Sequence, residues 1–188
     1  MEVYLIRHTT PKIEKGICYG QSDIPLADSF QTEAQKLLRD LPEKFDAVYS
    51  SPLSRCQKLS ALIANNPKTD ERLLELNFGD LEMKKWDDIN QEELNHWMQD
   101  FVNVKVPNGE NFIELNNRVN DFIDGLLKES SQKVAVVTHA GVIRCFVARI
   151  LEIPLKNAFK IPVDYSSVTK LNISGDGCYS SVEYLNKH

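Results

Sequence analysis

The chain has 188 residues, of which 42% are hydrophobic and 26% charged, and its formal net charge is −5. These proportions are ordinary for a water-soluble globular protein, and the length predicts a single domain over residues 1–188. The negative charge argues against a general binder of nucleic acid or of anionic membranes, which would carry a basic face. It leaves a small anionic substrate open, because a few arginines can gather in one pocket of an acidic protein.

We expect a cytoplasmic protein. No stretch of the sequence approaches the ~20 apolar residues of a membrane span. The first residues, MEVYLIRH, are too short for a signal peptide, and they carry an acid instead of a basic leader. The four cysteines are scattered without the spacing of metal ligands, which favours reduced thiols over disulfides or a zinc site. They are Cys18, Cys56, Cys145 and Cys178.

Strand and helix patterns alternate along the chain. Short apolar runs rich in β-branched residues predict buried strands, and helical patterns lie between and after them. The predicted strands span residues 3–6, 45–49 and 133–138, and the predicted helices span residues 53–64, 111–127 and 142–151. The tail predicts two more strands, residues 167–173 and 181–185, with a turn over residues 174–177. This alternation indicates a three-layer α/β/α sandwich with a largely parallel mixed sheet.

Residues 79–110 fit this alternation less well. The segment is charged and contains Trp86 and Trp97. It is interpreted either as a pair of surface helices that packs on the sheet or as a small helical cap beside the active site. With Phe112, the two tryptophans are candidates for an apolar wall of that site, or for ordinary core packing.

Histidines and arginines follow the predicted strands, where open α/β sheets place their ligands. Arg7 and His8 follow the first strand, and His139 follows the third. Arg55 falls in the first turn of the helix after the second strand, from where its side chain can lean back towards the strand end. Two guanidinium groups that converge in this way suit a phosphate dianion, and helix N-termini would add backbone N–H groups.

A carboxylate provides the fourth candidate group. Glu75 lies among Leu73, Leu74, Leu76 and Phe78. A carboxyl in apolar surroundings can act as a general acid, because burial disfavours its ionised form. The alternative is that Glu75 points to solvent from an alternating strand.

Four motifs, in order, resemble those of the histidine phosphatase superfamily, the phosphoglycerate mutase-like proteins. The match covers residues 3 to about 152. Its motifs are Leu5-Ile6-Arg7-His8-Thr9, Ser50-Ser51-Pro52-Leu53-x-Arg55, Glu75-x-x-Phe78-Gly79-x-x-Glu82 and Val137-Thr138-His139-x-Gly141-Val142-Ile143-Arg144. Thr9 and Ala140 stand where the superfamily usually has glycine. Glu14, six residues after His8, stands where the superfamily often has asparagine.

Further segments resemble the alpha-ribazole phosphatase branch of the superfamily, which acts in the assembly of the cobalamin nucleotide loop. They are residues 16–26, 78–83 and 107–112. The resemblance implies an alpha-ribazole 5′-phosphate phosphatase. Alternatives are a broad-specificity small-molecule phosphatase, a phosphoglycerate mutase-type enzyme, and an inactive relative that only binds phosphate. The expected partner is a small phosphate ester, with no nucleic acid or membrane, and the choice between monomer and homodimer stays open.

The resemblance also implies the role of each candidate. His8 would be the nucleophile that forms a phosphohistidine, with Arg7, Arg55 and His139 around the phosphoryl oxygens. Two arginines can replace the magnesium ion that other phosphatases need, so we expect no metal and no other cofactor. Glu75 would be the proton donor, and it is favoured over Glu82 because it lies directly upstream of the Phe-Gly pair. Weaker candidates for contact with the substrate are Thr9, Gln21, Glu82 and Ala140.

Overall fold

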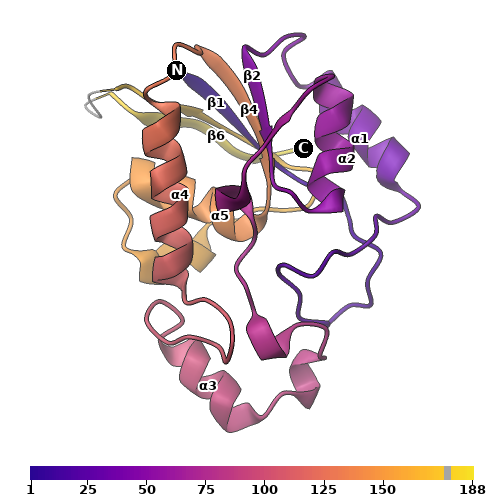
Figure 1. Cartoon of the computed structure of the whole chain (residues 1–188), viewed down its shortest axis with the longest axis vertical. Coiled ribbons are helices and arrows are strands. Elements are labelled where there is room, and N and C mark those ends of the chain that lie inside the picture. The colour runs from indigo at the N-terminus through magenta and orange to yellow at the C-terminus, as the bar shows by residue number, and fades with distance from the viewer. Residues whose placement is uncertain (176–178) are drawn as a thin grey trace.

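The computed structural model describes residues 1–175 and 179–188 and contains one sheet of six strands (Figure 1). The strand order is β3-β2-β4-β1-β5-β6. The strands are β1 (Glu2–Arg7), β2 (Ala47–Ser50), β3 (Lys68–Thr69), β4 (Lys133–Thr138), β5 (Val168–Asn172) and β6 (Ser181–Lys187). Of the predicted turn over 174–177, residues 176 and 177 lie outside the described residues, as does Cys178.

The four strands β3, β2, β4 and β1 run parallel, and β5 and β6 are antiparallel additions at one edge. The central strands β1 and β4 are buried on both faces, which explains their unbroken apolar runs. Along β1, Val3 and Leu5 face one core, and Tyr4 and Ile6 face the other. The predicted α/β sandwich with a largely parallel mixed sheet is therefore confirmed.

Helices cover both faces of the sheet (Figure 1). α4 (Phe112–Leu126) and α5 (Ala140–Ile150) pack on one face, and α1 (Phe30–Arg39) and α2 (Ser54–Ile63) pack on the other. The apolar stripe predicted for α4 is buried at every position, as the 3.6-residue period requires. Its members are Phe112, Leu115, Val119, Phe122, Ile123 and Leu126.

The sequence patterns did not identify α1 or β3. α1 buries only Ala34 and Leu37, so its apolar stripe is too narrow to stand out among charged residues. β3 has two exposed residues and is defined by its pairing with Tyr49 and Ser50 of β2. None of the helices in residues 1–175 and 179–188 is both long enough and apolar enough to cross a membrane.

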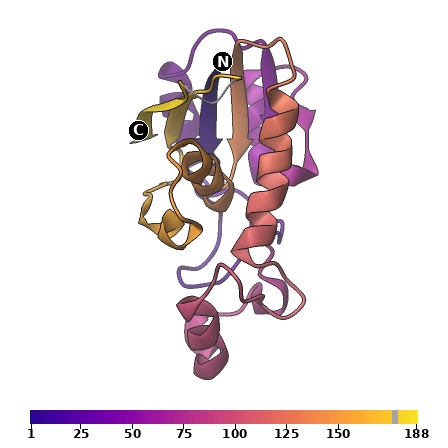
Figure 2. The same ribbon diagram turned by 90° about the vertical axis from the view of Figure 1, so that its left-hand side faces the viewer.

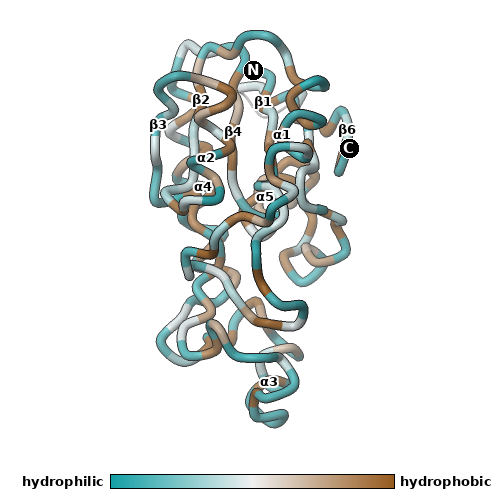
Figure 3. Tube along the Cα trace, turned by 90° about the vertical axis from the view of Figure 1, so that its right-hand side faces the viewer, coloured by the Kyte–Doolittle hydropathy of each residue, from teal (hydrophilic) through white to brown (hydrophobic). Residues whose placement is uncertain are grey.

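The segment 79–110 contains one α-helix, α3 (Gln91–Gln99), and the 3-10 helices Gly79–Leu81 and Trp86–Asp88. Figures 1 and 2 show α3 beyond the sheet, on the side to which β1 and β4 point. A pair of helices packed on the sheet is therefore not what the segment forms. Its own small core includes Leu81, Ile89 and Leu94. Figure 3 shows apolar and polar residues interleaved along this segment, whereas apolar residues dominate β2 and β4.

Candidate active site

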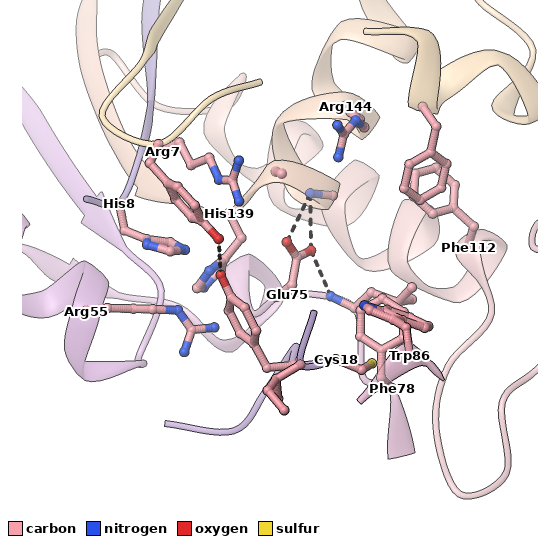
Figure 4. Close-up of a pocket in the computed structure, with 17 residues that line it drawn as sticks. Arg7, His8, Cys18, Arg55, Glu75, Phe78, Trp86, Phe112, His139 and Arg144 are labelled. Carbon is pink, nitrogen blue, oxygen red and sulfur yellow. Dashed lines mark hydrogen bonds between the residues drawn. The ribbon is translucent and has the colours of Figure 1, made fainter. Parts of the chain in front are cut away.

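A pocket opens beyond the carboxyl ends of the parallel strands, and it collects five of the predicted residues. Arg7, His8, Arg55, Glu75 and His139 all line it (Figure 4). Arg7 ends β1, and His8 follows it directly. His139 caps α5 directly after β4. Parallel strands bring their carboxyl ends to the same edge, so the sheet topology itself gathers these side chains.

His8 is a buried histidine with one ring nitrogen committed to the backbone. Its Nδ1 donates to the carbonyl oxygen of Thr9 at 2.8 Å. Because a carbonyl only accepts, this contact places a proton on Nδ1 and leaves Nε2 with a free lone pair in the neutral ring. The ring lies edge-on to that of His139, with centroids 5.1 Å apart.

Both histidines are held in their neutral forms. Burial lowers the pKa of His8 well below its usual 6.5, and the positive charges of Arg55 and Arg7 lower it further, against the weaker effect of the Thr9 carbonyl. Burial likewise lowers the pKa of His139, followed by the effects of His8 and the nearby arginines. A neutral imidazole is the form that can attack an electrophile.

We expect this neutrality to make stability depend on pH. Unfolded histidines take up protons near pH 6.5, whereas folded His8 and His139 do not, so the unfolded state binds more protons below that pH. The free energy of unfolding should therefore fall as the pH decreases below about 6.5, by up to about 1.4 kcal/mol per pH unit for each histidine. Urea unfolding between pH 7.5 and 5 measures the slope, which should be shallower in His8→Asn. An equal slope in the variant would contradict the assignment.

The two arginines lie on either side of His8, with Arg7 above it and Arg55 below it in Figure 4. Arg55 is completely buried, and its Nη1 and Nη2 donate to the carbonyls of Ser22 (2.7 Å) and Gly20 (2.6 Å). Arg7 donates from Nη1 to the Val163 carbonyl at 2.6 Å. Backbone contacts thus fix both guanidinium groups before any substrate binds.

His139 and Glu75 are both tied to the start of α5. His139 Nε2 lies 2.8 Å from Ser51 Oγ. The Glu75 carboxylate accepts from the amide of Leu76 (2.9 Å) and, through both oxygens, from that of Gly141 (3.2 Å). Gly141 permits this approach, because a Cβ there would lie 2.3 Å from Glu75 Oε1. Glu75 therefore faces the pocket at the N-terminus of α5, where the backbone amide of Gly141 holds both of its carboxyl oxygens in place.

The weaker candidates have different positions. Glu82 does not line the pocket; its carboxylate accepts from the amides of Gln21 (2.8 Å), Ser22 (2.6 Å) and Phe78 (3.2 Å). Burial raises the pKa of Glu82, but a hydrogen bond from the Ser22 hydroxyl and those from the three amides outweigh this effect and hold the pKa below its usual value. Glu82 thus anchors a loop and is no rival to Glu75 as an acid in the pocket.

The other three weaker candidates, Gln21, Thr9 and Ala140, have different positions relative to the pocket. Gln21 Nε2 donates to the backbone carbonyl of Glu75 at 3.0 Å, so this side chain supports the acid instead of lining the cavity. Thr9 is completely buried and contributes its carbonyl to His8. Only Ala140 is part of the pocket wall.

Sequence reasoning missed several residues of the wall. Tyr165 stacks on Arg7, whose Cζ lies 3.8 Å from the ring centroid, and its hydroxyl is hydrogen-bonded to that of Tyr19. Arg144 lines the pocket on the side of Glu75 away from Arg7 and His8 (Figure 4). A spacing signal existed for Arg144, because it lies one helical turn after Ala140. The loop residue Tyr165 carries no comparable signal.

The arrangement suits a phosphoryl group. Arg7 Nε and Arg55 Nε are buried donors that make no hydrogen bond within the described residues. Buried donors of this kind need an acceptor, and a tetrahedral dianion offers several. Within the same residues there is no group of three or more His, Cys, Asp and Glu side chains placed to hold a metal ion. The described cysteines Cys18, Cys56 and Cys145 are buried free thiols.

A second, apolar cavity adjoins the polar one and extends under α3. Its volume is about 580 Å³, within the range of small-molecule sites of about 300–1,000 Å³. Trp86 and Trp97 stack with centroids 6.3 Å apart, and Phe78 packs edge-on against both. Phe78, Trp86 and Phe159 line both cavities. Of the predicted apolar wall, Trp86 and Phe112 line the polar pocket, Trp97 lines the apolar cavity, and Phe112 also belongs to the main core.

The fold and this pocket define an α/β protein that can hold a phosphate ester against a neutral histidine. Residues 3–186 match the model of the histidine phosphatase superfamily, branch 1, and the chain belongs to this superfamily. The resemblance drawn from the four sequence motifs is thereby confirmed.

Individual relatives carry different names. The chain is 30% identical to "Putative phosphoserine phosphatase 2" of Hydrogenobacter thermophilus, over 98% of this chain and 95% of that protein. It is also 30% identical to adenosylcobalamin/alpha-ribazole phosphatase of Escherichia coli, over 100% of this chain and 92% of that one. The solved alpha-ribazole phosphatase of Shigella flexneri superposes with a TM-score of 0.88 at 28% identity, covering 100% and 96% of the two chains. These likenesses support a phosphatase and leave the substrate open.

Proposed function

We propose that the protein is an alpha-ribazole 5′-phosphate phosphatase that works through a phosphohistidine. The observation that carries the proposal is the junction of a dianion site with an aromatic cavity. Arg7, Arg55 and His139 surround the phosphoryl site. Trp86 and Phe78 line both this pocket and the apolar cavity under α3, so the two spaces adjoin there. A phosphate ester of a nucleoside-like alcohol with an apolar aromatic base has these two parts. The relatives named alpha-ribazole phosphatase support the same substrate.

In the first step, His8 Nε2 attacks phosphorus while the ester P–O bond breaks. Arg7 and Arg55 neutralise the charge on the phosphoryl oxygens, which is the main requirement of this reaction. Glu75, in its acid form, gives its proton to the departing alkoxide. The products are the free alcohol, phospho-His8 and the Glu75 carboxylate.

In the second step, water attacks phospho-His8. The Glu75 carboxylate accepts a proton from that water as the P–N bond breaks, and inorganic phosphate leaves. Glu75 returns to its acid form and His8 to its neutral form, so one residue acts as acid and then as base. The Nδ1 contact to Thr9 keeps the ring in the same orientation in both steps.

A second candidate is a phosphate ester whose alcohol carries a carboxylate, such as phosphoserine. Arg144 is half-buried, and its only hydrogen bond within the described residues is from Nε to the Ile161 carbonyl at 3.2 Å. Burial lowers the pKa of this guanidinium, against the effect of nearby Glu75. Because Glu75 lies between Arg144 and the phosphoryl site, Arg144 could bind an anionic group on the leaving alcohol. The relative from Hydrogenobacter thermophilus favours the same class.

A substrate panel decides between the two candidates. The purified protein should hydrolyse alpha-ribazole 5′-phosphate with a kcat/KM about 10²-fold above that for ribose 5-phosphate, because burial of the base contributes roughly 2–3 kcal/mol. Trp86→Ala should remove most of that preference and leave ribose 5-phosphate little changed. Equal rates on the two esters would refute the specific assignment. A preference for phosphoserine that Arg144→Gln abolishes would establish the second candidate.

A further inference from the structure

An ion pair outside the pocket holds the backbone on both sides of Glu75. Arg118, on α4, donates from Nη1 to the carbonyls of Arg72 (2.9 Å) and Leu74 (2.6 Å). Its Nη2 donates to the carbonyl of Glu75 itself at 2.8 Å. One side chain thus binds three carbonyls of the segment that leads into the acid.

Glu110 completes the contact from the other direction. Its two carboxylate oxygens accept from Arg118 Nε and Nη2, both at 2.9 Å, in a bidentate pair. The same carboxylate accepts from the amide of Asn77 at 3.0 Å. The side chains of Arg118 and Glu110 are only 18% and 20% exposed, so water competes weakly for these bonds.

The segment needs such support because it forms no helix or strand. Residues 74–78 lie between two 3-10 helices, and no sheet ladder satisfies their backbone groups. Residues 107–110 pack closely against this segment. A Cβ on Gly109 would lie 2.4 Å from the Asn77 carbonyl oxygen, so only glycine fits there. This accounts physically for the Pro107-Asn108-Gly109-Glu110 segment, which places Glu110 beside Asn77.

We infer that Arg118 and Glu110 are positioning residues for the proton transfer by Glu75. The inference rests on the proposed function, in which Glu75 protonates the leaving alcohol. Arg118 and Glu110 fix the main chain at Glu75 and Asn77, and the Gly141 amide receives the carboxylate. With the main chain released, the carboxylate loses its fixed place at the start of α5. A displacement of about 1 Å at a reacting group can cost on the order of 10² in rate.

The test uses two substrates that differ in their need for an acid. An alkyl ester such as ribose 5-phosphate leaves as an alkoxide and requires protonation, whereas p-nitrophenyl phosphate leaves as a stable phenolate. The quantity compared is kcat/KM, which covers the steps through release of the alcohol and not the later hydrolysis of phospho-His8. Arg118→Gln should lower kcat/KM for ribose 5-phosphate about 10²-fold and that for p-nitrophenyl phosphate less than about threefold.

Two further variants serve as a second test of the inference and as its control. Glu110→Gln keeps its size and loses the charge, so it should shift the two substrates in the same direction by a smaller factor, and it is informative if Arg118→Gln fails to fold. Arg149→Gln is the matched control: Arg149 also binds a carboxylate, Asp124, and a carbonyl, Asn120, but its hydrogen bonds do not involve residues 72–77. The control should leave the ratio of the two kcat/KM values unchanged.

The outcomes separate this inference from the proposed function. Equal losses on both substrates, or no loss on either, in folded Arg118→Gln and Glu110→Gln would overturn the positioning role. Glu75→Gln is measured beside them and should itself show the selective loss on the alkyl ester. If Glu75→Gln lacks that selectivity, the proposed role of Glu75 fails. If Glu75→Gln shows it and the other two variants do not, only the inference fails.

Discussion

Replacing His8 by alanine is expected to lower kcat by roughly 10⁴–10⁶-fold, the range seen when other enzymes lose a nucleophile. The reason is geometric as well as chemical. The Thr9 carbonyl fixes the His8 ring through Nδ1, and burial keeps the ring neutral, so Nε2 has the free lone pair that the proposed nucleophile needs. Alanine removes the bond-forming atom, and the remaining cations can only bind the ester.

The covalent intermediate provides the direct measurement. Rapid quench with a ³²P-labelled ester should give protein-bound phosphate that is labile in acid and stable in base, and His8→Ala should give none. His96→Ala is a suitable control, because His96 is an exposed residue of α3 outside the pocket, and its labelling should match that of the unaltered protein. Phosphate that remains bound to His8→Ala would refute the assignment of the nucleophile.

The parts of the site that lie at strand ends were predictable from the sequence. Arg7, His8 and His139 follow apolar runs that are recognisable as buried strands, and the parallel order of the sheet brings these ends together. The position of Arg55 followed from a helix that begins a few residues after β2. In each case a local pattern was sufficient, because the topology converts sequence position into spatial proximity.

The parts that depend on long-range loop packing were not predictable. Tyr165 reaches the pocket from the chain before β5, and Glu82 turns away from it to bind the amides of Gln21 and Ser22. No periodicity encodes these contacts, because they join irregular segments far apart in the chain. The role of the Arg118–Glu110 pair could not be predicted for the same reason. The pair binds backbone carbonyls and a backbone amide, which every residue type except proline carries, so no residue pattern marks the contact.

The second large effect is expected for Arg55→Lys, which should lower kcat/KM about 10³-fold, as for the loss of a donor to a developing oxyanion. Arg55 holds the carbonyls of Gly20 and Ser22, while its buried Nε makes no hydrogen bond to any residue in the described part of the chain. A single ammonium cannot reproduce this fork. The two unpaired carbonyls should also lower the free energy of unfolding by about 1–3 kcal/mol. Steady-state kinetics and urea unfolding measure the two effects.

A substitution at the adjacent residue Ser54 distinguishes the role of Arg55 in phosphate binding from its role in holding the loop that contains Gly20 and Ser22. Ser54→Ala weakens the tether of the same loop, because Ser54 Oγ donates to Asp23 at 2.8 Å, and it leaves the guanidinium of Arg55 in place. The inhibition constant of inorganic phosphate should rise strongly in Arg55→Lys and little in Ser54→Ala. Equal increases would show that loop placement, not the guanidinium, governs binding. The two variants should differ strongly because the chain carries a net charge of −5. Attraction for a phosphate ester therefore has to come from cations inside the pocket, of which Arg55 is the most deeply buried.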